Sequence, residues 1–458
     1  MTLFGTAGIR GPVRTEVTPS LALAVGRAVG QEPGPFVVGR DGRETGSALV
    51  AALEAGIESA GEDVYRVGQV PTPALAFASR GRRGVMVTAS HNPPTDNGIK
   101  VFDDGVEYDR AAEETIERRV EDEPSPAEWD EWGNGRQVDL LDEYRSAVTD
   151  YVRRVTGKDR PLADQRIVVD CGNGMGALAT PQVLRALGGD VVTLHANVDG
   201  HFPGRESKPT PETLTDLRAF LAEHQADLGI AHDGDADRVV IVAPDGEVVH
   251  EDTVLAWLAE RYARESDAPD PVVVTTPNAS GRIDERVEAA GGRIERVRLG
   301  ALHEGIARER EQGDDDTSVV FAAEPWKHIH TRFGGWIDGV ASAAVVSSLV
   351  AEAGDVATLR EPVNERPYRK VSVDCPDDRK GGAMERIREA LPERFSDGTV
   401  DTDYGVRIDL PDGSWVLVRP SGTEPYVRVY AESDDVDDLL ETTVSVVEAA
   451  VESTDGPE

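Results

Sequence analysis

The sequence predicts an α/β protein with three consecutive mixed α/β domains of similar architecture, followed by a C-terminal α+β domain. At 458 residues the chain is too long for one hydrophobic core. Strand-like and helix-like segments alternate over most of its length, which is typical of sheets covered by helices. The last part instead shows the pattern of antiparallel hairpins. The predicted domains comprise residues 1–155, 156–256, 257–362 and 363–458.

The first predicted domain alternates short apolar runs with amphipathic segments. The run FVVGR and the two strand-like runs after it are bounded by glycine and polar residues, which is typical of strands in a parallel sheet. The segments between them have the apolar spacing of helices. The expected strands are 35–40, 63–68 and 84–89, the expected helices are 47–61, 73–80 and 140–155, and 156–165 is the expected boundary.

The second and third predicted domains repeat this rhythm without a recognisable sequence repeat. Apolar β-branched runs such as RIVVD and PVVVTT predict strands, and the segments between them predict helices. The expected strands are 166–170, 191–196, 227–232, 238–244, 271–276, 293–299 and 318–324, and the expected helices are 180–187, 212–224, 280–290, 302–311 and 339–352.

The last predicted domain has a different pattern. Two strand-like runs flank a Pro-Asp-Gly turn, which predicts a hairpin in an antiparallel sheet. The expected elements are a strand at 370–376, a helix at 380–391, the hairpin-containing region 405–433 and a final helix at 435–451.

The chain is strongly acidic. It contains 85 Asp and Glu against 48 Lys and Arg, which gives a formal charge of -37. Such a field disfavours nucleic acid and anionic membranes, so we expect a small-molecule partner. Acid-rich, lysine-poor chains resemble those of salt-loving archaea, where high salt screens the self-repulsion, and we therefore expect a halophilic protein. The six lysines are Lys100, Lys158, Lys208, Lys327, Lys370 and Lys380.

The two cysteines, Cys171 and Cys375, lie in apolar strand-like runs. This number and placement exclude a disulfide framework and predict buried, reduced thiols. The N-terminal segment lacks a basic region followed by an apolar stretch, and no apolar run has the length that spans a bilayer. We therefore expect a cytoplasmic protein.

The first of four chemically suggestive loops follows the strand-like run that ends at residue 89. It holds Ser90 and His91, and Lys100 follows a short distance on. Ligand chemistry in α/β sheets gathers at the carboxyl ends of strands, so Ser90 can act there as a nucleophile or a phosphoryl carrier. Neighbouring side chains on an extended chain point in opposite directions, and a polar loop with Asn-Pro turn chemistry is the alternative.

The second loop, DGDADR, lies between two predicted strands. Its three aspartates occupy alternate positions around a glycine turn, so their carboxylates can converge and need a cation to offset their repulsion. Oxygen ligands favour a hard ion, and without a preceding helix or a glutamate at the twelfth position this is not a calcium EF-hand loop. Magnesium shared with a phosphate is the prediction, and a solvated acidic turn is the alternative. The candidate ligands are Asp233, Asp235 and Asp237.

The third loop, Glu324-Pro325-Trp326-Lys327-His328, also follows a strand-like run. Its carboxylate, indole, ammonium and imidazole groups can together hydrogen-bond to a sugar and stack on it. An exposed aromatic residue with charged neighbours is the alternative.

The fourth loop, RPSGTEP at 419–425, is followed by Arg428 on a strand-like run. A Ser-Gly-Thr turn offers two hydroxyls and several backbone N–H groups, and arginine offers bidentate donors. This combination suits a phosphate monoester, and a plain hairpin turn is the alternative.

Together the four loops supply a phosphoryl acceptor, a divalent cation site, sugar-contacting groups and a phosphate anchor. Phosphoryl transfer needs this set, because charge must be neutralised, the reacting groups aligned and the attacking hydroxyl deprotonated. The combination therefore predicts phosphoryl transfer on a phosphosugar.

The chain resembles the α-D-phosphohexomutase superfamily along essentially its whole length. The order and the spacing of the matching motifs agree with that family, and the resemblance implies domains arranged around a central cleft. The motifs are FGTAGIRG at 4–11, VGRDGRETG at 38–46, TASHNPPTDNGIK at 88–100, DGDADR at 233–238 and RPSGTEPYVRVY at 419–430.

This resemblance implies a phosphosugar mutase, an isomerase that interconverts hexose 6-phosphate and hexose 1-phosphate. Ser90 would be the phosphoserine and would bind one Mg²⁺ together with the three aspartates. A hexose 1,6-bisphosphate would form as the bound intermediate and return its other phosphate to Ser90. Closure by the fourth domain would keep water away from the phosphoserine.

The resemblance also implies roles for individual polar residues. Lys100 would be the general base or acid, His91 is a further catalytic candidate, and Arg10 would steady the phosphoserine. Arg238 would contact the substrate near the metal loop. The phosphate that does not react would be held by Arg419, Ser421, Gly422, Thr423 and Arg428.

The third loop departs from the family pattern, which usually reads Glu-x-Ser-Gly and is often followed by His. Trp326 and Lys327 replace the Ser-Gly pair. We expect the tryptophan to narrow the pocket and the lysine to add charge. Glu324, Lys327 and His328 are the candidates for sugar binding, with glucosamine or mannose phosphate as the expected substrate and glucose phosphate as an alternative.

Other functions are compatible with the same motifs. They are a phosphopentomutase, a sugar-bisphosphate synthase or phosphatase of the same fold, and a catalytically lapsed regulator that binds a sugar phosphate. The intact Ser90, Lys100 and aspartates argue against the regulator. Both a monomer and a homodimer are compatible with the sequence, since it contains no recognisable coiled-coil heptads.

Overall fold

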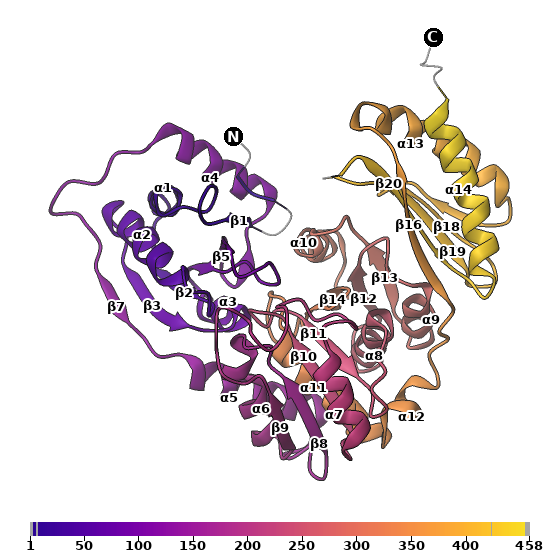
Figure 1. The fold of residues 1–458 in the computed structure, drawn as a ribbon, viewed down its shortest axis with the longest axis horizontal. Coiled ribbons are helices and arrows are strands. Elements are labelled where there is room, and N and C mark those ends of the chain that lie inside the picture. Colours follow the sequence, from indigo (N-terminus) through magenta and orange to yellow (C-terminus); the bar gives the residue numbers. More distant parts are fainter. Residues whose placement is uncertain (1–2, 6–7, 423, 454–458) are drawn as a thin grey trace.

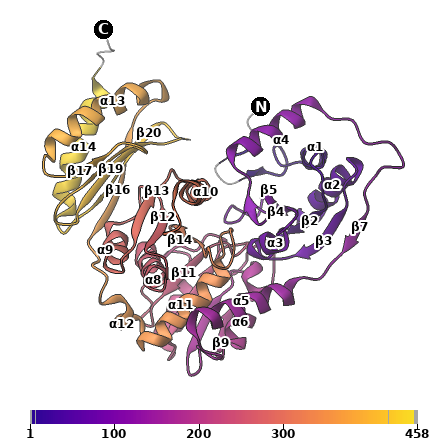
Figure 2. The ribbon, with the colours of Figure 1, turned by 180° about the vertical axis from the view of Figure 1, so that it is seen from behind.

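The computed structural model describes residues 3–5, 8–422 and 424–453. In this part of the chain three mixed sheets are followed by one antiparallel sheet. Figure 1 shows the N-terminal and C-terminal parts as two arms, with the second and third sheets at the base between them, and Figure 2 shows the same arrangement from behind. The predicted fold class is confirmed, and the four parts are named domains I to IV. None of the described helices is long and apolar enough to cross a membrane.

Domain I is built on a seven-stranded sheet in the order β1-β5-β4-β2-β3-β7, with β6 paired to β5. Strands β2, β3 and β4 are parallel, as the apolar pattern predicts, whereas β5 runs antiparallel to β4 and β1. The sequence does not predict β5, because the Asp-Asn-Gly at its start favours a turn. The elements are β1 (Ile9–Pro12), α1 (Pro19–Val29), β2 (Phe36–Arg40), α2 (Gly46–Ser59), β3 (Val64–Gln69), α3 (Thr72–Ala78), β4 (Arg83–Val87), β5 (Asp96–Asp103), β6 (Val106–Glu107), α4 (Arg110–Asp122), β7 (Gly135–Gln137) and α5 (Leu141–Thr156).

Domain II contains a four-stranded sheet in the order β11-β10-β8-β9. Strands β8, β9 and β10 are parallel, and β11 returns antiparallel to β10 through the aspartate loop. The elements are β8 (Arg166–Asp170), a 3₁₀ helix η1 (Met175–Leu178), α6 (Thr180–Ala186), β9 (Asp190–Leu194), α7 (Thr215–Glu223), β10 (Leu228–His232) and β11 (Val239–Val242).

Domain III repeats this arrangement in the order β13-β12-β14-β15, with β15 antiparallel to β14. The boundary predicted between residues 256 and 257 falls inside α8, a continuous helix that packs on β12 and β14, so the division lies before this helix. The other predicted boundaries stay predictions. The elements are α8 (Glu251–Arg264), β12 (Asp270–Thr275), α9 (Gly281–Ala289), β13 (Arg293–Arg296), α10 (Leu302–Gln312), β14 (Thr317–Glu324), β15 (Lys327–Ile329), α11 (Gly339–Ala353) and α12 (Val356–Arg360).

Domain IV is a five-stranded antiparallel sheet in the order β16-β20-β19-β18-β17. The predicted Pro-Asp-Gly turn joins β18 and β19, and α13 and α14 cover one face of the sheet through a cluster of valine, isoleucine and leucine side chains. The opposite face carries Trp415, Leu417 and Tyr430. The elements are β16 (Tyr368–Asp374), α13 (Asp377–Arg394), β17 (Thr399–Asp401), β18 (Val406–Asp409), β19 (Trp415–Pro420), β20 (Tyr426–Glu432) and α14 (Val436–Glu452).

One continuous apolar core joins domains I, II and III. Helix α11 is buried on every side from Gly339 to Val350 and packs against α5, α6, α8 and β10. A helix that is apolar all round must lie inside a larger core. Domains II and III therefore share one core, which supports the second and third predicted loops. Cys171 and Cys375 are buried free thiols, as predicted.

Candidate active site

Three of the four predicted loops are hairpin connections that leave the carboxyl end of a parallel strand. They join β4 to β5, β10 to β11, and β14 to β15. Each contains a non-glycine residue with a positive φ angle, namely Ser90 at 50°, Ala236 at 60° and Trp326 at 66°. This backbone region is sparsely populated, and residues held in it are typical of functional sites because the surrounding structure must enforce the conformation.

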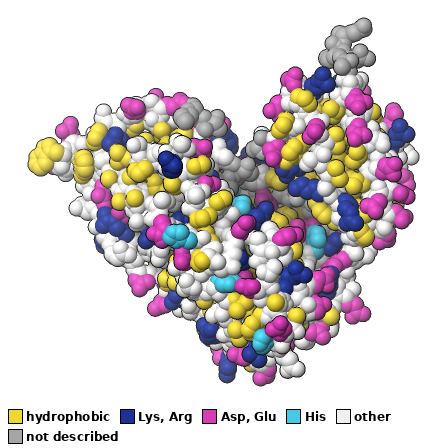
Figure 3. All heavy atoms as spheres, viewed as in Figure 1, with side chains coloured by type: hydrophobic (Ala, Val, Ile, Leu, Met, Phe, Trp, Pro, Cys, Tyr) yellow, Lys and Arg dark blue, Asp and Glu magenta, His cyan; other side chains and the backbone are white. Residues whose placement is uncertain are grey.

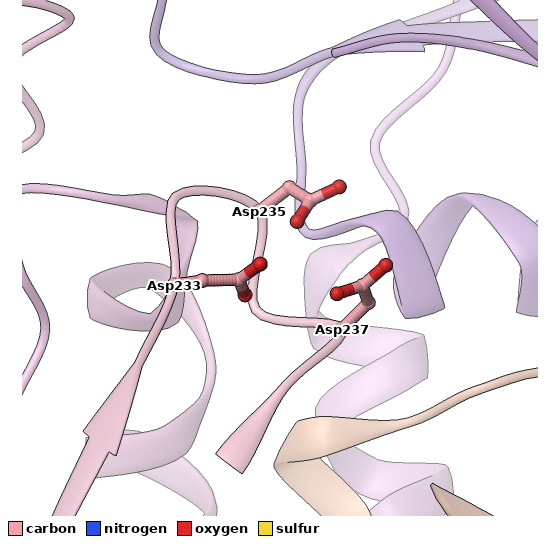
Figure 4. Close-up of side chains that lie close together, drawn as sticks. All are labelled: Asp233, Asp235 and Asp237. Atoms are coloured by element: carbon pink, nitrogen blue, oxygen red, sulfur yellow. The ribbon is translucent and has the colours of Figure 1, made fainter. Parts of the chain in front are cut away.

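The three aspartates of the second loop form a compact, buried cluster. One side-chain oxygen of each lies within 4.8 Å of the others, and Figure 4 shows the three carboxylates gathered around one turn. Within the described residues, Oδ1 of Asp235 and Oδ1 of Asp237 are buried and accept no hydrogen bond. Leaving such oxygens unpaired is costly, so this set of donors fits a hard divalent cation such as the predicted Mg²⁺.

Residues of domain I hold the aspartate loop in place. Thr72 donates a hydrogen bond from Oγ1 to Oδ2 of Asp235 at 2.6 Å, and its backbone N–H donates to the carbonyl oxygen of Asp235 at 3.0 Å. Thr88 donates from Oγ1 to Oδ2 of Asp41 at 2.7 Å and lies 3.2 Å from Oδ2 of Asp235. Thr88 is the first residue of the motif TASHNPPTDNGIK, which is the signal that points to it, whereas Thr72 lies outside every quoted motif and sequence reasoning misses it.

Ser90 joins the first loop to the cluster of Asp233, Asp235 and Asp237. Its Oγ donates a hydrogen bond to Oδ2 of Asp233 at 2.6 Å, and Nδ1 of His91 lies 3.3 Å from the same Oγ. The predicted phosphoryl carrier is thus fully buried and in direct contact with a predicted metal ligand. The side chains of Ser90 and His91 lie close together although the residues are adjacent, because the left-handed backbone conformation of Ser90 turns the chain sharply.

Arg43 fixes the shape of the loop around Ser90. The fully buried guanidinium donates hydrogen bonds to the carbonyl oxygens of Ser90 at 2.9 Å and Asn92 at 2.7 Å. Asp41 orients it through an ion pair of 3.1 Å. Both residues belong to the motif VGRDGRETG, which is the signal that points to them.

Lys100 lies on β5, and its ammonium group contacts the aspartate cluster. Its Nζ is 3.1 Å from Oδ2 of Asp237 and 3.9 Å from Oε2 of Glu107. Although burial alone would lower the pKa of Lys100, these two carboxylates raise it. Glu107 is therefore a second partner of the predicted proton carrier that sequence reasoning misses.

The charges in this cluster act strongly on one another. Burial and the carboxylates of Asp237 and Asp235 raise the pKa of Asp233 well above its usual value. Burial would also raise the pKa of Asp237, but Lys100 and other nearby cations lower it instead. Burial, followed by the charges of two arginines, lowers the pKa of His91 to about 2, so its imidazole is neutral.

A cavity of about 510 Å³ opens beside this cluster, between domains I, II and III. Figure 3 shows the molecule hollowed between its two arms. Arg10, Arg238 and Lys327 supply three cationic side chains to the cavity, and Glu324 supplies a carboxylate. Such a surface suits an anionic substrate. The remaining lining residues are Leu3, Phe4, Gly5, Gly8, His91, Leu299 and Gly300.

The third loop differs in part from its prediction. Trp326 does not narrow the cavity, because its side chain packs against the core of domain II and its carbonyl oxygen accepts a hydrogen bond from the N–H of Val239. Glu324 and Lys327 line the cavity. His328 is only 1% exposed and contacts Oγ of Ser342 at 3.1 Å, so it lies behind the loop rather than in the cavity.

The fourth loop lies on domain IV and contributes no residue to this cavity among those described. Arg419 and Arg428 are directly paired across β19 and β20, so their side chains share one face of the sheet. Lys380 donates hydrogen bonds to the carbonyl oxygens of Ser421 at 2.7 Å and Glu424 at 2.6 Å, so α13 is tied to both of these loop residues. Thr423 lies outside the described residues.

Known proteins share this architecture. Residues 1–127 match phosphoglucomutase/phosphomannomutase α/β/α domain I, residues 142–246 match α/β/α domain II, and residues 371–449 match the C-terminal domain. A phosphopentomutase of Thermococcus kodakarensis is 40% identical over 99% of this chain and 100% of its own length. A probable phosphoglucosamine mutase of Methanopyrus kandleri is 42% identical over 98% of each chain.

A solved structure agrees with these relatives. The crystal structure of a phosphoglucomutase/phosphomannomutase family protein from Burkholderia thailandensis superposes with a TM-score of 0.85, at 27% identity, over 100% of this chain and 99% of the other. Sequence motifs, fold and relatives thus agree. The chain belongs to the phosphoglucomutase/phosphomannomutase family of the α-D-phosphohexomutase superfamily and is a phosphosugar mutase.

Proposed function

We propose that this mutase interconverts the 6-phosphate and the 1-phosphate of a hexose, with Ser90 as the phosphoryl carrier. The observation that supports this most directly is the 2.6 Å contact between Oγ of Ser90 and Oδ2 of Asp233. The contact supports a position of the Ser90 hydroxyl between the aspartate cluster and the cavity lined by Arg10 and Arg238. Phosphoryl transfer gains most from such positioning and charge neutralisation.

In the proposed first half-reaction, a free sugar hydroxyl attacks the phosphorus of phosphoserine 90. The bond from phosphorus to Oγ breaks, the bond to the sugar oxygen forms, and the hydroxyl proton is transferred in net terms to Oγ. Lys100 is the proposed proton carrier, because its Nζ contacts Asp237 beside Ser90. The second half-reaction reverses these steps with the other phosphate of the bound 1,6-bisphosphate, which regenerates phosphoserine 90.

The remaining residues are proposed to bind the metal ion and to orient the phosphate groups of the substrate. Asp233, Asp235 and Asp237 would hold one Mg²⁺, which when bound supplies positive charge against the transferring phosphoryl group. Arg10 and Arg238 line the cavity and would bind phosphate oxygens. Arg419, Arg428 and the turn between them would hold the distal phosphate once domain IV approaches the cavity and excludes water.

A second candidate substrate is a phosphopentose, since a relative that is 40% identical over 99% of this chain is named phosphopentomutase. Glucosamine and mannose phosphates are the expected hexoses. A coupled assay over the 1-phosphates of glucosamine, mannose, glucose and ribose, with Mg²⁺ and a trace of sugar bisphosphate, separates these possibilities.

The test of the carrier is Ser90→Ala, compared with Ser47→Ala, an exposed serine at the start of α2. We expect one phosphate on the peptide that contains Ser90 in the unmodified chain and in Ser47→Ala, and neither phosphate nor mutase activity in Ser90→Ala. Full activity of Ser90→Ala with an unchanged circular dichroism spectrum would disprove the proposal.

A further inference from the structure

A carboxylate that the proposed mechanism does not use lies beside Lys100. Glu107 is the second residue of the two-residue strand β6, and Phe102 of β5 lies directly opposite it. Lys100 and Phe102 are two positions apart on β5, so their side chains share one face of the sheet. Glu107 is therefore the diagonal cross-strand neighbour of Lys100 on that face. Its Oε2 lies 3.9 Å from Nζ of Lys100.

The turn between β5 and β6 fixes the position of Glu107. The two turn residues, Asp104 and Gly105, have φ angles of 48° and 84°, the combination that a tight two-residue hairpin requires. The N–H of Gly105 donates to Oγ of Ser79 at 3.2 Å, and a Cβ at Gly105 would lie only 3.0 Å from Cε3 of Trp336. The turn is thus packed closely between the end of α3 and domain III, which holds β6 in place.

Glu107 is weakly paired for a carboxylate in this position. Its side chain is 20% exposed, and in the described part of the chain Lys100 is the one cation that forms an ion pair with it. A separation of 3.9 Å is too long for a hydrogen bond, so the pair offsets little of the cost of removing the carboxylate from water. The pair would therefore strengthen if Nζ of Lys100 came within hydrogen-bond distance of Glu107.

Lys100 has room to make this approach. A small cavity of about 10 Å³, close to the space that one water molecule needs, is lined by Lys100, Glu107 and Asp237. His303 lines the same cavity from domain III, and its Nε2 donates to the carbonyl oxygen of Gly335 at 2.7 Å. Burial lowers the pKa of His303, so its imidazole is neutral and does not compete with Lys100 for the carboxylate.

The other partner of Lys100 has a competing task. Nζ lies 3.1 Å from Oδ2 of Asp237, which is one of the three proposed Mg²⁺ ligands and whose Oδ1 is buried without a hydrogen-bond partner. A bound cation would neutralise much of the charge of Asp237 and would repel the ammonium group of Lys100. Glu107 is not a member of the aspartate cluster, so its charge stays available to Lys100.

We propose that Glu107 is a positioning residue, which takes over the ammonium group of Lys100 when Asp237 binds the cation. The inference rests on the proposed function, in which Lys100 carries the proton and the aspartates hold Mg²⁺. Nζ moves into the small cavity and comes within hydrogen-bond distance of Glu107. This movement keeps the ammonium group at the edge of the aspartate cluster and reduces its repulsion with the cation.

Calorimetric titration with Mg²⁺ alone tests this coupling without a mutase assay. Glu107→Gln keeps the shape of the side chain and removes its charge, so Lys100 stays on Asp237 and opposes the cation. The dissociation constant for Mg²⁺ should rise at least about tenfold, as it does when a residue behind a metal ligand is lost. The matched control is Glu114→Gln, which removes a 53% exposed carboxylate from an ion pair in the same domain and should bind Mg²⁺ like the unmodified chain.

A double-mutant cycle shows whether Glu107 acts through Lys100. In Lys100→Met, which removes the ammonium group, adding Glu107→Gln should change the Mg²⁺ dissociation constant by less than about twofold. Without metal, the double variant should melt at a higher temperature than Lys100→Met, because it no longer buries Glu107 without a partner. Equal weakening of Mg²⁺ binding by Glu107→Gln in both backgrounds would overturn the proposal, since Glu107 would then act on the cation directly.

Kinetics at saturating Mg²⁺ decides the outcome if Lys100→Met does not fold. Glu107→Gln should lower kcat at least about tenfold while KM changes less than about threefold, because other residues bind the phosphates and only the proton carrier is misplaced. Glu114→Gln should match the unmodified chain. An unchanged kcat and an unchanged Mg²⁺ dissociation constant in Glu107→Gln would overturn the proposal. Full activity of Ser90→Ala would instead disprove the phosphoryl carrier and leave the Mg²⁺ cycle as it is.

Discussion

Oγ of Ser90 and Oδ2 of Asp233 lie 2.6 Å apart, although 143 positions separate the two residues in the chain. The contact joins the hairpin that follows β4 to the hairpin that follows β10, so domains I and II share one polar cluster. Thr72 and Thr88 strengthen this connection from domain I. Substitutions of Asp233 or Asp235 should therefore affect both metal binding and the interface between domains I and II.

The first prediction concerns Asp235→Asn. The substitution removes one buried negative charge, so the metal-free protein should melt at a higher temperature than the unmodified one. Mg²⁺ should raise the melting temperature of the unmodified protein by mass action and that of the variant much less. Half-maximal activity should need at least about tenfold more Mg²⁺. Calorimetry with Mg²⁺ or EDTA provides the measurement, and the exposed Glu223→Gln serves as the control. Equal Mg²⁺ requirements for the variant and the unmodified chain would contradict the site.

The second prediction concerns Lys380, which donates to the backbone carbonyl oxygens of Ser421 and Glu424 in the loop proposed to bind the distal phosphate. Hydrogen bonds from charged groups contribute about 1.5–3 kcal/mol each, so Lys380→Met should loosen the turn and raise KM about tenfold or more. The value of kcat should fall less, because Lys380 lies away from the reacting atoms. Lys380→Arg should restore part of the loss.

Steady-state kinetics checks this prediction, with Lys158→Met as the matched control, since Lys158 is 55% exposed on the surface. A variant that lowers kcat at unchanged KM would show that Lys380 acts in some other way.

Much of this architecture can be predicted because the parallel strands are short apolar runs between glycine-rich turns. The aspartate cluster is predictable for a local reason, since three carboxylates around one glycine turn need no long-range information. Lys100 is different. Its partners are set by the antiparallel pairing of β5 with β4, which matches Lys100 with Met86, and a strand that begins Asp-Asn-Gly gives no sign of this pairing.

The direction of Trp326 is also unpredictable from the sequence. A tryptophan beside a lysine in a polar loop suggests a stacking platform for sugar. The positive φ of 66° instead turns the indole onto the core of domain II and leaves Lys327 in the cavity. Backbone conformation at one residue decides which side chain lines the cavity, and composition does not encode it.

The third prediction concerns stability against acid. His330 is buried, with Nδ1 2.7 Å from the hydroxyl of Tyr262 and Nε2 2.8 Å from Oγ of Ser342. Burial, and then the neighbouring His328, lowers the pKa of His330 well below 6.5. The folded state therefore keeps this imidazole neutral while the unfolded chain takes up a proton below pH 6.5. Its contribution to stability is present above pH 6.5 and is lost as the pH falls.

His330→Gln should therefore be least stable relative to the unmodified protein at pH 7.5. The gap in free energy of unfolding should narrow by about 1.4 kcal/mol per pH unit below 6.5. Comparing the two proteins cancels the titration of other buried groups, such as Asp252, whose pKa burial raises to about 8. Urea unfolding at several pH values provides the measurement. The control is His201→Gln, because His201 is 72% exposed. A gap that does not change with pH would contradict a neutral His330.

The fourth prediction concerns salt. With a formal charge of -37, the folded chain repels itself more strongly than the expanded unfolded chain does. Raising KCl from about 0.1 M to about 1 M shortens the Debye length from about 10 Å to about 3 Å. The melting temperature should therefore rise. A non-ionic osmolyte at equal osmolarity is the control, because it does not screen charge. A melting temperature that stays constant or falls in KCl would contradict a halophilic character.

The fifth prediction concerns the choice of sugar. The cavity presents three basic side chains, Arg10, Arg238 and Lys327, against the single carboxylate of Glu324, which also accepts a hydrogen bond from the N–H of Gly300 at 2.5 Å. Burial lowers the pKa of Lys327, and the charge of Glu324 acts in the opposite direction. If a substrate ammonium lies about 5 Å from the ammonium of Lys327, their repulsion costs on the order of 3 kcal/mol at an effective dielectric constant of about 20, before screening by salt. The ammonium group of glucosamine phosphate should therefore be disfavoured relative to the hydroxyl of mannose phosphate.

Lys327→Met keeps most of the side-chain volume and removes the charge. We expect it to improve kcat/KM for glucosamine 6-phosphate relative to mannose 6-phosphate by about tenfold, whereas Lys327→Arg should leave the ratio nearly unchanged. Both variants should retain activity with mannose 6-phosphate, which separates a change in specificity from a general loss of function. If the two variants shift the ratio equally, the shape of residue 327 rather than its charge selects the sugar.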